Sequence, residues 1–291
     1  MATTTINHPL VAIVGQTASG KSALALELAR RFSGEIIAAD SRTIYKGMDI
    51  GTAKPSIADR RLVPHHLIDI LEPDQSFSAA QFQKLAYECI SDISSRGNLP
   101  LLVGGTGLYV DAVIYHYSFR GSANMALRQR LNDLSVSELQ DILFKQGLPL
   151  PNNPQNPRYL ARSIETAGAP EARDHINSNT LVIGMDIERE ALRQRVEQRV
   201  DTMLNSGLEQ EVQRLTEQYG WNCLALQSIG YQEFRSYFEN GVSLKEVRNE
   251  IIRNTMRYAK RQKTWFKRNK SISWISNTED AAVLITTLLN K

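Results

Sequence analysis

The stretch LVAIVGQTASGKS, residues 10–22, decides the fold of this chain. Its first five residues are apolar and rich in branched side chains, which is typical of a short buried strand. The next eight, GQTASGKS, fit the pattern G-x-x-x-x-G-K-[ST], and apolar residues then recur at helical spacing. A strand, a glycine-rich loop and a helix in this order form the context in which the pattern binds phosphate groups.

The loop is expected to supply several kinds of phosphate ligand. Its glycines let successive backbone N–H groups point inward, and the following helix adds the positive end of its dipole. Lys21 is expected to reach the outer phosphates, and the Ser22 hydroxyl to ligate Mg²⁺. The residues predicted to bind the phosphate chain are Gly15, Gln16, Thr17, Ala18, Ser19, Gly20, Lys21 and Ser22. The loop alone leaves open NTP hydrolysis, phosphoryl transfer and the use of diphosphate as a leaving group.

Residues 35–39 and 100–103 predict two further buried strands, which end at Asp40 and at a Gly-Gly-Thr-Gly turn. Alternation of such strands with helices favours an α/β fold, a P-loop NTPase-like parallel sheet core flanked by helices. Ligands gather at the carboxyl ends of parallel strands, so Asp40 and Thr106 are expected in the same crevice as Lys21. Asp40 is there a candidate general base or magnesium ligand, with a turn or cap role as the alternative.

The buried-strand signal is lost in the middle of the chain and returns with residues 181–187, LVIGMDI. Between them, prolines and asparagines surround two helical stretches. We interpret residues 115–170 as an inserted small helical domain. Residues 1–114 and 171–291 are then the catalytic core with a helical C-terminal region, in which residues 244–270 predict a long basic helix.

The composition is that of an ordinary globular protein without a strong overall charge. The 291 residues are 42% hydrophobic and 22% charged, with a formal net charge of +3. Affinity for nucleic acid would therefore have to come from local patches. Two cysteines without metal-ligand spacing favour a reducing compartment. We recognise no signal peptide or membrane span and expect a cytoplasmic protein without a membrane partner.

The long C-terminal helix carries a row of cations. Arg253, Arg257 and Arg261 recur at i, i+4 and are expected to form one stripe, with Lys260 beside them. Acidic residues are absent from residues 251–275, so the row is expected to lack intrahelical partners. A solvated basic face is the alternative, but a surface that faces a polyanion is favoured.

Other arginines are candidates for anion contacts. Arg158 and Arg162 lie one helical turn apart in the inserted domain and are candidates for a second nucleic-acid contact. Arg193, Arg195 and Arg199 follow the returning strand closely enough for one of them to reach a phosphate.

Three tyrosines and two histidines have alternative roles. Tyr45, Tyr109 and Tyr231 are candidates for stacking on a base, with packing in the core or at a rim as the alternative. His65 and His66 suggest a metal site, but adjacent residues of an extended chain point to opposite faces and do not easily share one ion. Packing or hydrogen bonding is the favoured role for this pair.

Eight segments form an ordered set over nearly the whole chain. They are GQTASGKS, EIIAADSRTIYKGMDIGTAKP, VPHHLIDI, FSAAQF, PLLVGGTGLYV, VEQRVDTMLNSGLEQEV, LQSIGYQEF and RYAKRQKTWF. In this order they resemble the tRNA dimethylallyltransferases (tRNA isopentenyltransferases). The resemblance implies transfer of a dimethylallyl group from dimethylallyl diphosphate to N6 of the adenosine 3′-adjacent to the anticodon in tRNA, with release of diphosphate.

The resemblance also implies roles for single residues. Asp40 matches the general base for the N6 amine, Thr106 matches a threonine that holds the diphosphate, and Arg199 matches an arginine on the diphosphate; Lys21 completes the predicted catalytic set. The residues predicted to contact tRNA are Asp40, Ser41, Arg42, Thr43, Thr106, Arg158, Tyr159, Leu160, Ala161, Arg162, Arg253, Arg257, Lys260 and Arg261. The implied partners are the tRNA anticodon stem-loop, dimethylallyl diphosphate and Mg²⁺, and we expect a monomer.

Two features depart from the family pattern. Gln16 stands where the family usually has proline, a change that a loop can tolerate because its backbone binds the phosphate. Residues 115–170 are shorter and more divergent than the resemblance leads us to expect.

Three other functions stay open on the residues alone. An ATP-dependent small-molecule kinase would not need the basic helix. A prenyltransferase of free adenine nucleotides would need neither that helix nor the inserted domain. A non-catalytic RNA-binding protein would not need Lys21, Ser22, Asp40 and Thr106 intact.

Overall fold

The computed structural model describes residues 8–119, 125–168 and 175–290. The chain divides into two compact units. We call residues 1–114 with 176–291 the core, and residues 115–175 the module. Within the described ranges, no helix is long and apolar enough to cross a bilayer.

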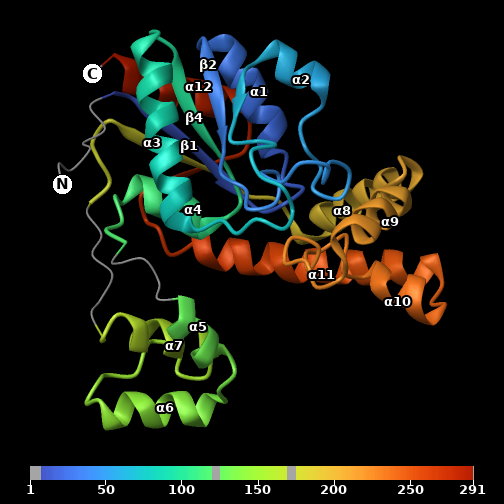
Figure 1. The fold of residues 1–291 in the computed structure, drawn as a ribbon. Helices are drawn as coiled ribbons and strands as arrows, with labels where there is room; N and C mark the ends of the chain where they lie inside the picture. The colour runs from blue at the N-terminus through green and yellow to red at the C-terminus, as the bar shows by residue number, and fades with distance from the viewer. Residues whose placement is uncertain (1–7, 120–124, 169–174, 291) are drawn as a thin grey trace. The chain divides into compact units, whose positions relative to one another are not determined.

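A parallel sheet forms the centre of the core (Figure 1), which confirms the predicted fold class. Its six strands, counted over the described residues, lie in the order β3-β2-β4-β1-β5-β6. Every neighbouring pair runs parallel, so the carboxyl ends of all the strands lie along one edge. The strands are β1 (Leu10–Gly15), β2 (Gly34–Ala38), β3 (His65–His66), β4 (Leu99–Gly104), β5 (Thr180–Met185) and β6 (Ile272–Ile275).

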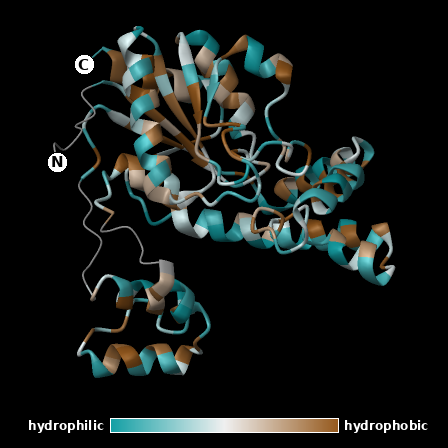
Figure 2. Cartoon of the chain, in the orientation of Figure 1, coloured by the Kyte–Doolittle hydropathy of each residue, from teal (hydrophilic) through white to brown (hydrophobic). Residues whose placement is uncertain are grey.

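The central strands are apolar on both faces because helices cover both faces. β1 and β4 are buried along their whole length, and Figure 2 shows the centre of the sheet as its most hydrophobic part. α1 (Lys21–Arg31) and α12 (Thr278–Leu289) pack together on one face, where Leu28 and Ile285 share a core with β1 residues. α3 (Ala79–Ser95) and α4 (Gly107–Ile114) cover the other face (Figure 1).

A second group of helices packs beneath the carboxyl edge of the sheet (Figure 1). Its members are α8 (Arg189–Asn205), α9 (Leu208–Tyr219), α10 (Phe234–Asn240) and α11 (Leu244–Phe266). They bury their apolar faces in one cluster with residues of the segment after β2, such as Ile44 and Met48. α2 (Ile57–Leu62) follows that segment. The long polar segment after β2 is therefore a packed part of the core.

The end of the chain corrects one expectation. The basic helix ends at Phe266 and not at residue 270, and residues 272–275 form β6 at the edge of the sheet. The strand was missed because four residues are too few for a clear alternation of apolar and polar side chains. The basic residues before it also resemble those of the helix, so the helix was predicted to continue through them.

The module has its own small core. It contains α5 (Met125–Asn132), α6 (Val136–Lys145) and α7 (Pro157–Glu165), and Leu139, Leu143 and Leu160 are fully buried between them. Arg128 of α5 donates two hydrogen bonds, of 2.7 and 2.6 Å, to the carboxylate of Glu165 in α7. The predicted helical character of this segment is therefore present, with three helices in its described residues.

Candidate active site

The phosphate loop joins β1 to α1 in a conformation that its glycines permit. Gly20 has φ 99°, in the left-handed region that disfavours a side chain, and α1 begins directly after it. The Lys21 ammonium donates a hydrogen bond of 3.0 Å to the carbonyl of Gln16 and so folds back over the loop. Ser19 is almost completely buried, and its hydroxyl has no hydrogen-bond partner among the described residues.

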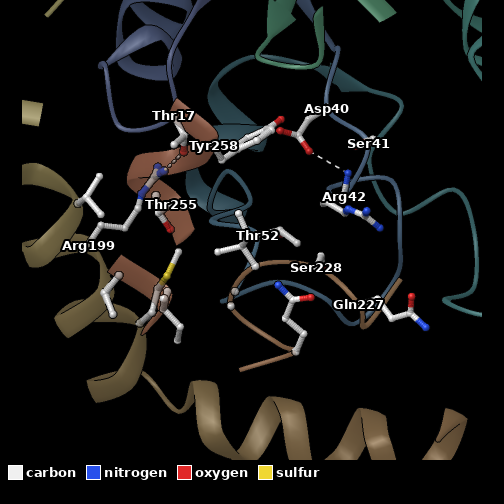
Figure 3. Close-up of a pocket in the computed structure, with 18 of the residues that line it drawn as sticks. Thr17, Asp40, Ser41, Arg42, Thr52, Arg199, Gln227, Ser228, Thr255 and Tyr258 are labelled. Carbon is white, nitrogen blue, oxygen red and sulfur yellow. Dashed lines mark hydrogen bonds between the residues drawn. The ribbon is translucent and has the colours of Figure 1, made fainter. Parts of the chain in front are cut away.

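Asp40 and Thr106 follow the neighbouring strands β2 and β4 at the carboxyl edge of the sheet, and of the two Asp40 lines the same cavity as Lys21 while Thr106 does not. The Thr106 hydroxyl accepts a hydrogen bond of 3.1 Å from the Ser41 amide and thereby joins the two strand ends. One carboxylate oxygen of Asp40 accepts a hydrogen bond of 2.8 Å from the Arg42 amide (Figure 3). Asp40 thus has the turn role that was the alternative, while its side chain also lines a cavity.

Two arginines of α8 reach the phosphate loop. Arg199 donates a hydrogen bond of 3.1 Å to the Thr17 hydroxyl (Figure 3). Arg195 donates one of 3.1 Å to the carbonyl of Ser19. Arg193 instead pairs with Glu197 at 2.9 Å, one turn along its own helix. The expectation that an arginine of this helix approaches the phosphate site therefore holds for two of the three.

The loop is an electropositive and partly dehydrated site. Burial lowers the pKa of Lys21 to about 8; the Asp40 carboxylate opposes this shift and the Arg199 charge adds to it. Burial likewise lowers the pKa of Arg199. Two cations that lose hydration near one carboxylate gain from an additional anion, so the site favours a phosphate-bearing ligand.

Two cavities meet at the phosphate loop. The larger has a volume of about 350 Å³ and the smaller about 90 Å³. Both are lined by Thr17, Asp40, Thr52 and Arg199. Lys21 and Ser22 line the smaller cavity only, which is therefore the side where a phosphate group is expected. The larger cavity continues from Asp40 along Ser41, Arg42, Met203, Gln227, Ser228, Ile229, Gly230, Tyr258 and Arg261 (Figure 3).

The resemblance implied tRNA contacts for the stretch around residues 257–262 without singling out Tyr258, which lies beside Asp40 in the larger cavity (Figure 3). Burial and the nearby Asp40 charge raise the pKa of Tyr258 to about 12, and interactions with Thr106 and Gln262 oppose the shift. Sequence reasoning missed the turn of residues 227–230. In the sequence, Tyr258 is indistinguishable from the other core-facing positions of a basic helix. It reaches the site because α11 packs beneath the carboxyl ends of the strands.

Gln262 of α11 connects the phosphate loop to the turn after β4. Its side-chain oxygen accepts a hydrogen bond of 2.7 Å from the Thr17 amide, and its nitrogen donates one of 2.9 Å to the carbonyl of Gly105. A Cβ on Gly105 would lie 2.2 Å from that nitrogen, so a larger residue here would displace the Gln262 amide from its present position. Gln16 makes a second connection between the phosphate loop and α11, because its side chain donates a hydrogen bond of 3.1 Å to the carbonyl of Ala259.

Glu211 of α9 holds the segment that carries Thr52. Its buried carboxylate accepts hydrogen bonds from the amides of Asp49, Ile50 and Gly51, at 2.9 to 3.1 Å. The Tyr231 hydroxyl donates a further bond of 2.7 Å to it. An acidic residue in an amphipathic helix gave no sign of this role in the sequence.

The three tyrosines that were candidates for base stacking are core residues. Tyr231 is fully buried, and Tyr45 and Tyr109 are each 7% exposed. Tyr109 is stacked on Phe82 with their ring centroids 4.3 Å apart. The alternative of core packing is therefore correct for all three.

The cations of α11 face two surfaces and not one stripe. Arg261 lines the larger cavity. A separate groove between α8 and α11 is lined by Arg253, Arg257 and Lys260. Each i, i+4 step rotates a side chain by about 40° around the helix, which separates the first arginine from the last. Arg253 also pairs with Glu250 at 2.9 Å, so the expectation that the row lacks intrahelical partners is wrong for this residue.

The predicted tRNA contacts in α7 of the module divide into buried and exposed side chains. Leu160 and Ala161 lie in the module's core, at 0% and 7% exposure, so their side chains are not on its surface. Arg158 and Tyr159 are exposed, and Arg162 lies 3.5 Å from Glu165. The alternation follows the helical period, since one face of α7 packs on α5 and α6.

The smaller cavity offers oxygen ligands that suit Mg²⁺. The Ser22 hydroxyl and the Asp40 carboxylate both line it. In the described part of the chain, no three His, Cys, Asp or Glu side chains form a metal cage. Mg²⁺ is commonly held by one or two protein oxygens, substrate phosphates and water, and the residues present fit that mode.

Most of the chain matches one known family. A family model described as IPP transferase matches residues 43–269. The chain belongs to this family. A tRNA dimethylallyltransferase of Anoxybacillus flavithermus is 44% identical over 288 residues, which cover 94% of this chain and 92% of the relative. That of Bacillus subtilis is 41% identical over 287 residues, with coverages of 93% and 91%. The family predicted from the eight segments is thereby confirmed.

Solved structures of the IPP transferase family have the same fold. A tRNA isopentenylpyrophosphate transferase from Bacillus halodurans superposes with a TM-score of 0.76 at 38% identity, over 98% of this chain and 97% of the other. A eukaryotic dimethylallyltransferase acting on tRNA superposes with a TM-score of 0.74 at 25% identity, over 92% and 74%.

Proposed function

We propose that this chain transfers the dimethylallyl group of dimethylallyl diphosphate to N6 of the adenosine 3′-adjacent to the anticodon in tRNA, and releases diphosphate. The observation that carries the proposal is the meeting of two cavities at Asp40. One cavity contains the phosphate ligands Lys21 and Ser22, and the other has room for a base. Two substrates that enter them would meet at one carboxylate, as a transfer between them requires.

The diphosphate of the donor is held at the phosphate loop. Its ligands are the loop amides with Lys21, Ser22, Thr106 and Arg199. When the allylic C–O bond breaks, its electron pair passes to the diphosphate oxygen, and these donors stabilise the charge that develops there. Mg²⁺, when bound through Ser22, would neutralise part of the same charge.

The adenine of tRNA enters the larger cavity as an unstacked base. Its N6 attacks the allylic carbon as the C–O bond breaks, and Asp40 takes the proton that N6 loses. The carboxylate is oriented for this task by its hydrogen bond from the Arg42 amide. Ser41, Arg42 and Arg261 lie at the same cavity and are proposed to contact the RNA.

The remaining tRNA contacts are proposed for exposed side chains outside the cavity, most of them cations. Arg257 and Lys260 of α11 are exposed, as are Arg158 and Tyr159 of the module. Such residues bind the phosphate backbone without reading its sequence. We propose that the chain acts as a monomer with Mg²⁺.

The test is mass analysis of nucleosides from tRNA incubated with the protein, Mg²⁺ and dimethylallyl diphosphate. The expected result is an adenosine that carries one dimethylallyl group, and mass analysis of ribonuclease fragments of the same tRNA should place it in the anticodon loop only. Unmodified tRNA together with hydrolysis of ATP would refute the proposal in favour of a kinase. Prenylation of adenosine monophosphate without prenylation of tRNA would identify a transferase for free nucleotides.

A further inference from the structure

Thr43 is a buried hydroxyl in the smaller cavity without a hydrogen-bond partner. The residue is 7% exposed, and its Oγ1 is unpaired among the described residues. A buried polar atom that stays unpaired costs about 1–3 kcal/mol, so such atoms commonly have a ligand or water as partner. Thr43 lines the cavity together with Ser22 and Asp40. Its side chain therefore faces the phosphate site and not the outer surface.

His65 also lines the same cavity. Its Nδ1 lies 2.8 Å from the carbonyl of Val63. A carbonyl only accepts hydrogen bonds, so Nδ1 carries the hydrogen, and the Nε2 of the neutral ring is an acceptor. Burial lowers the pKa of His65, which favours the neutral ring. The next residue, His66, is bonded through Nε2 to Glu35 at 2.7 Å and does not line the cavity.

The ligand of His65 Nε2 has to donate a hydrogen bond, and the Thr43 hydroxyl is able to accept one as well as to donate one. The oxygens of an ionised diphosphate only accept, so they do not match the lone pair of His65 Nε2. Water bound to Mg²⁺ is a strong donor, and Mg²⁺ gives up its water reluctantly. The cavity, at about 90 Å³, has room for several water molecules beside Ser22. A hydrated Mg²⁺ therefore matches the acceptors that Thr43, His65 and Asp40 provide.

We propose that Thr43 and His65 accept hydrogen bonds from water molecules of the Mg²⁺ that accompanies the diphosphate, and so position the ion at Ser22. The proposal rests on the proposed function, since it takes the phosphate loop to hold a diphosphate. It assigns these two residues to metal binding, with no direct contact to the diphosphate or to tRNA.

The test measures diphosphate affinity with and without metal. Inorganic diphosphate is titrated calorimetrically into the full chain, once with excess Mg²⁺ and once with EDTA. The quantity of interest is the ratio of the two affinities. Thr43→Val removes the hydroxyl at constant shape. His65→Asn keeps a donor for the Val63 carbonyl and removes Nε2.

Each variant is expected to lower the Mg²⁺-dependent ratio about tenfold, the usual loss when a partner behind a metal ligand is removed. The affinity in EDTA is expected to stay within about twofold of wild type, because the loop ligands are intact. Thr43→Ser should restore the ratio, and His66→Asn, next to the site but outside the cavity, should leave it unchanged.

Three results would overturn the inference. Equal losses with and without Mg²⁺ would mean that the two residues touch the diphosphate itself. An unchanged affinity ratio in the variants would mean that the two residues only line the cavity. A wild-type chain whose diphosphate affinity does not depend on Mg²⁺ would mean that no metal ion binds with the diphosphate. A wild-type chain that binds no diphosphate at all would instead refute the proposed function, which separates the two failures.

Discussion

The side chain of Gln262 and the backbone amide of Thr17 are joined by a hydrogen bond of 2.7 Å. This bond ties α11, whose outer surface carries cations, to the loop that is expected to hold the diphosphate. Gln262 also reaches the Gly105 carbonyl and is itself only 5% exposed. The helix proposed to contact tRNA is therefore also part of the wall of the phosphate site.

Replacement of Gln262 by methionine should weaken both the fold and the phosphate site. The change keeps the length of the side chain but leaves the Thr17 amide and the Gly105 carbonyl without their partner, at a cost of about 1–3 kcal/mol in the free energy of unfolding. Denaturant unfolding and calorimetric titration with diphosphate measure the two effects. Thr264→Val, which removes a hydroxyl bonded only to its own helix in the described contacts, is the control and should change neither.

Asp40→Asn should slow the chemical step about 10²–10⁴-fold while tRNA affinity stays nearly intact. The amide keeps an oxygen for the Arg42 amide, so the local turn survives, but it no longer takes a proton. Single-turnover prenylation and filter binding of tRNA separate the two effects. Asp40→Ala removes the turn bond as well and is expected to lose affinity in addition. An unchanged single-turnover rate in Asp40→Asn would remove Asp40 as the base.

Diphosphate binding should weaken as pH rises above about 8. Burial holds the pKa of Lys21 at about 8 in the free protein, and a bound anion raises it. The bound state thus holds a proton that the free state releases above that pH, so affinity falls by up to about tenfold per pH unit. Titrations in buffers of different ionisation enthalpy should show proton uptake near pH 8. Lys21→Arg stays charged, and a pH dependence that persists in this variant would point to another group.

Replacement of Arg253 and Arg257 by alanine should weaken tRNA binding and reduce its dependence on salt. Each lost phosphate contact lowers the slope of log affinity against log salt by about 1. Arg257→Ala should have the larger effect, because Arg253 is already paired with Glu250. Arg235→Ala in α10, which removes an arginine paired with Glu239, is the control. A slope that stays the same in the double variant would mean that these cations are only a solvated face.

Secondary structure and loop motifs were predictable from the sequence where they depend on residues that are close together in the chain. The buried strands, the phosphate loop and the first helix follow from short-range patterns, and Asp40 and Thr106 follow from the rule that parallel strands end along one edge. β6 and the end of α11 were missed because four residues carry too little periodicity. The sequence did not decide between base stacking and core packing for Tyr45, Tyr109 and Tyr231. Their burial depends on residues distant in sequence, such as Phe82 and Glu211.

The sequence by itself determined the phosphate loop, the parallel sheet and the family, since each depends on residue types at fixed short spacing. The tertiary structure alone decided which residues share the two cavities. Tyr258, Gln262 and His65 lie far from residues 15–22 in the sequence, and each reaches the site through long-range packing of α11 or β3. It also decided that the cations of α11 face two surfaces, because the helix turns each successive arginine by a fixed angle against α8.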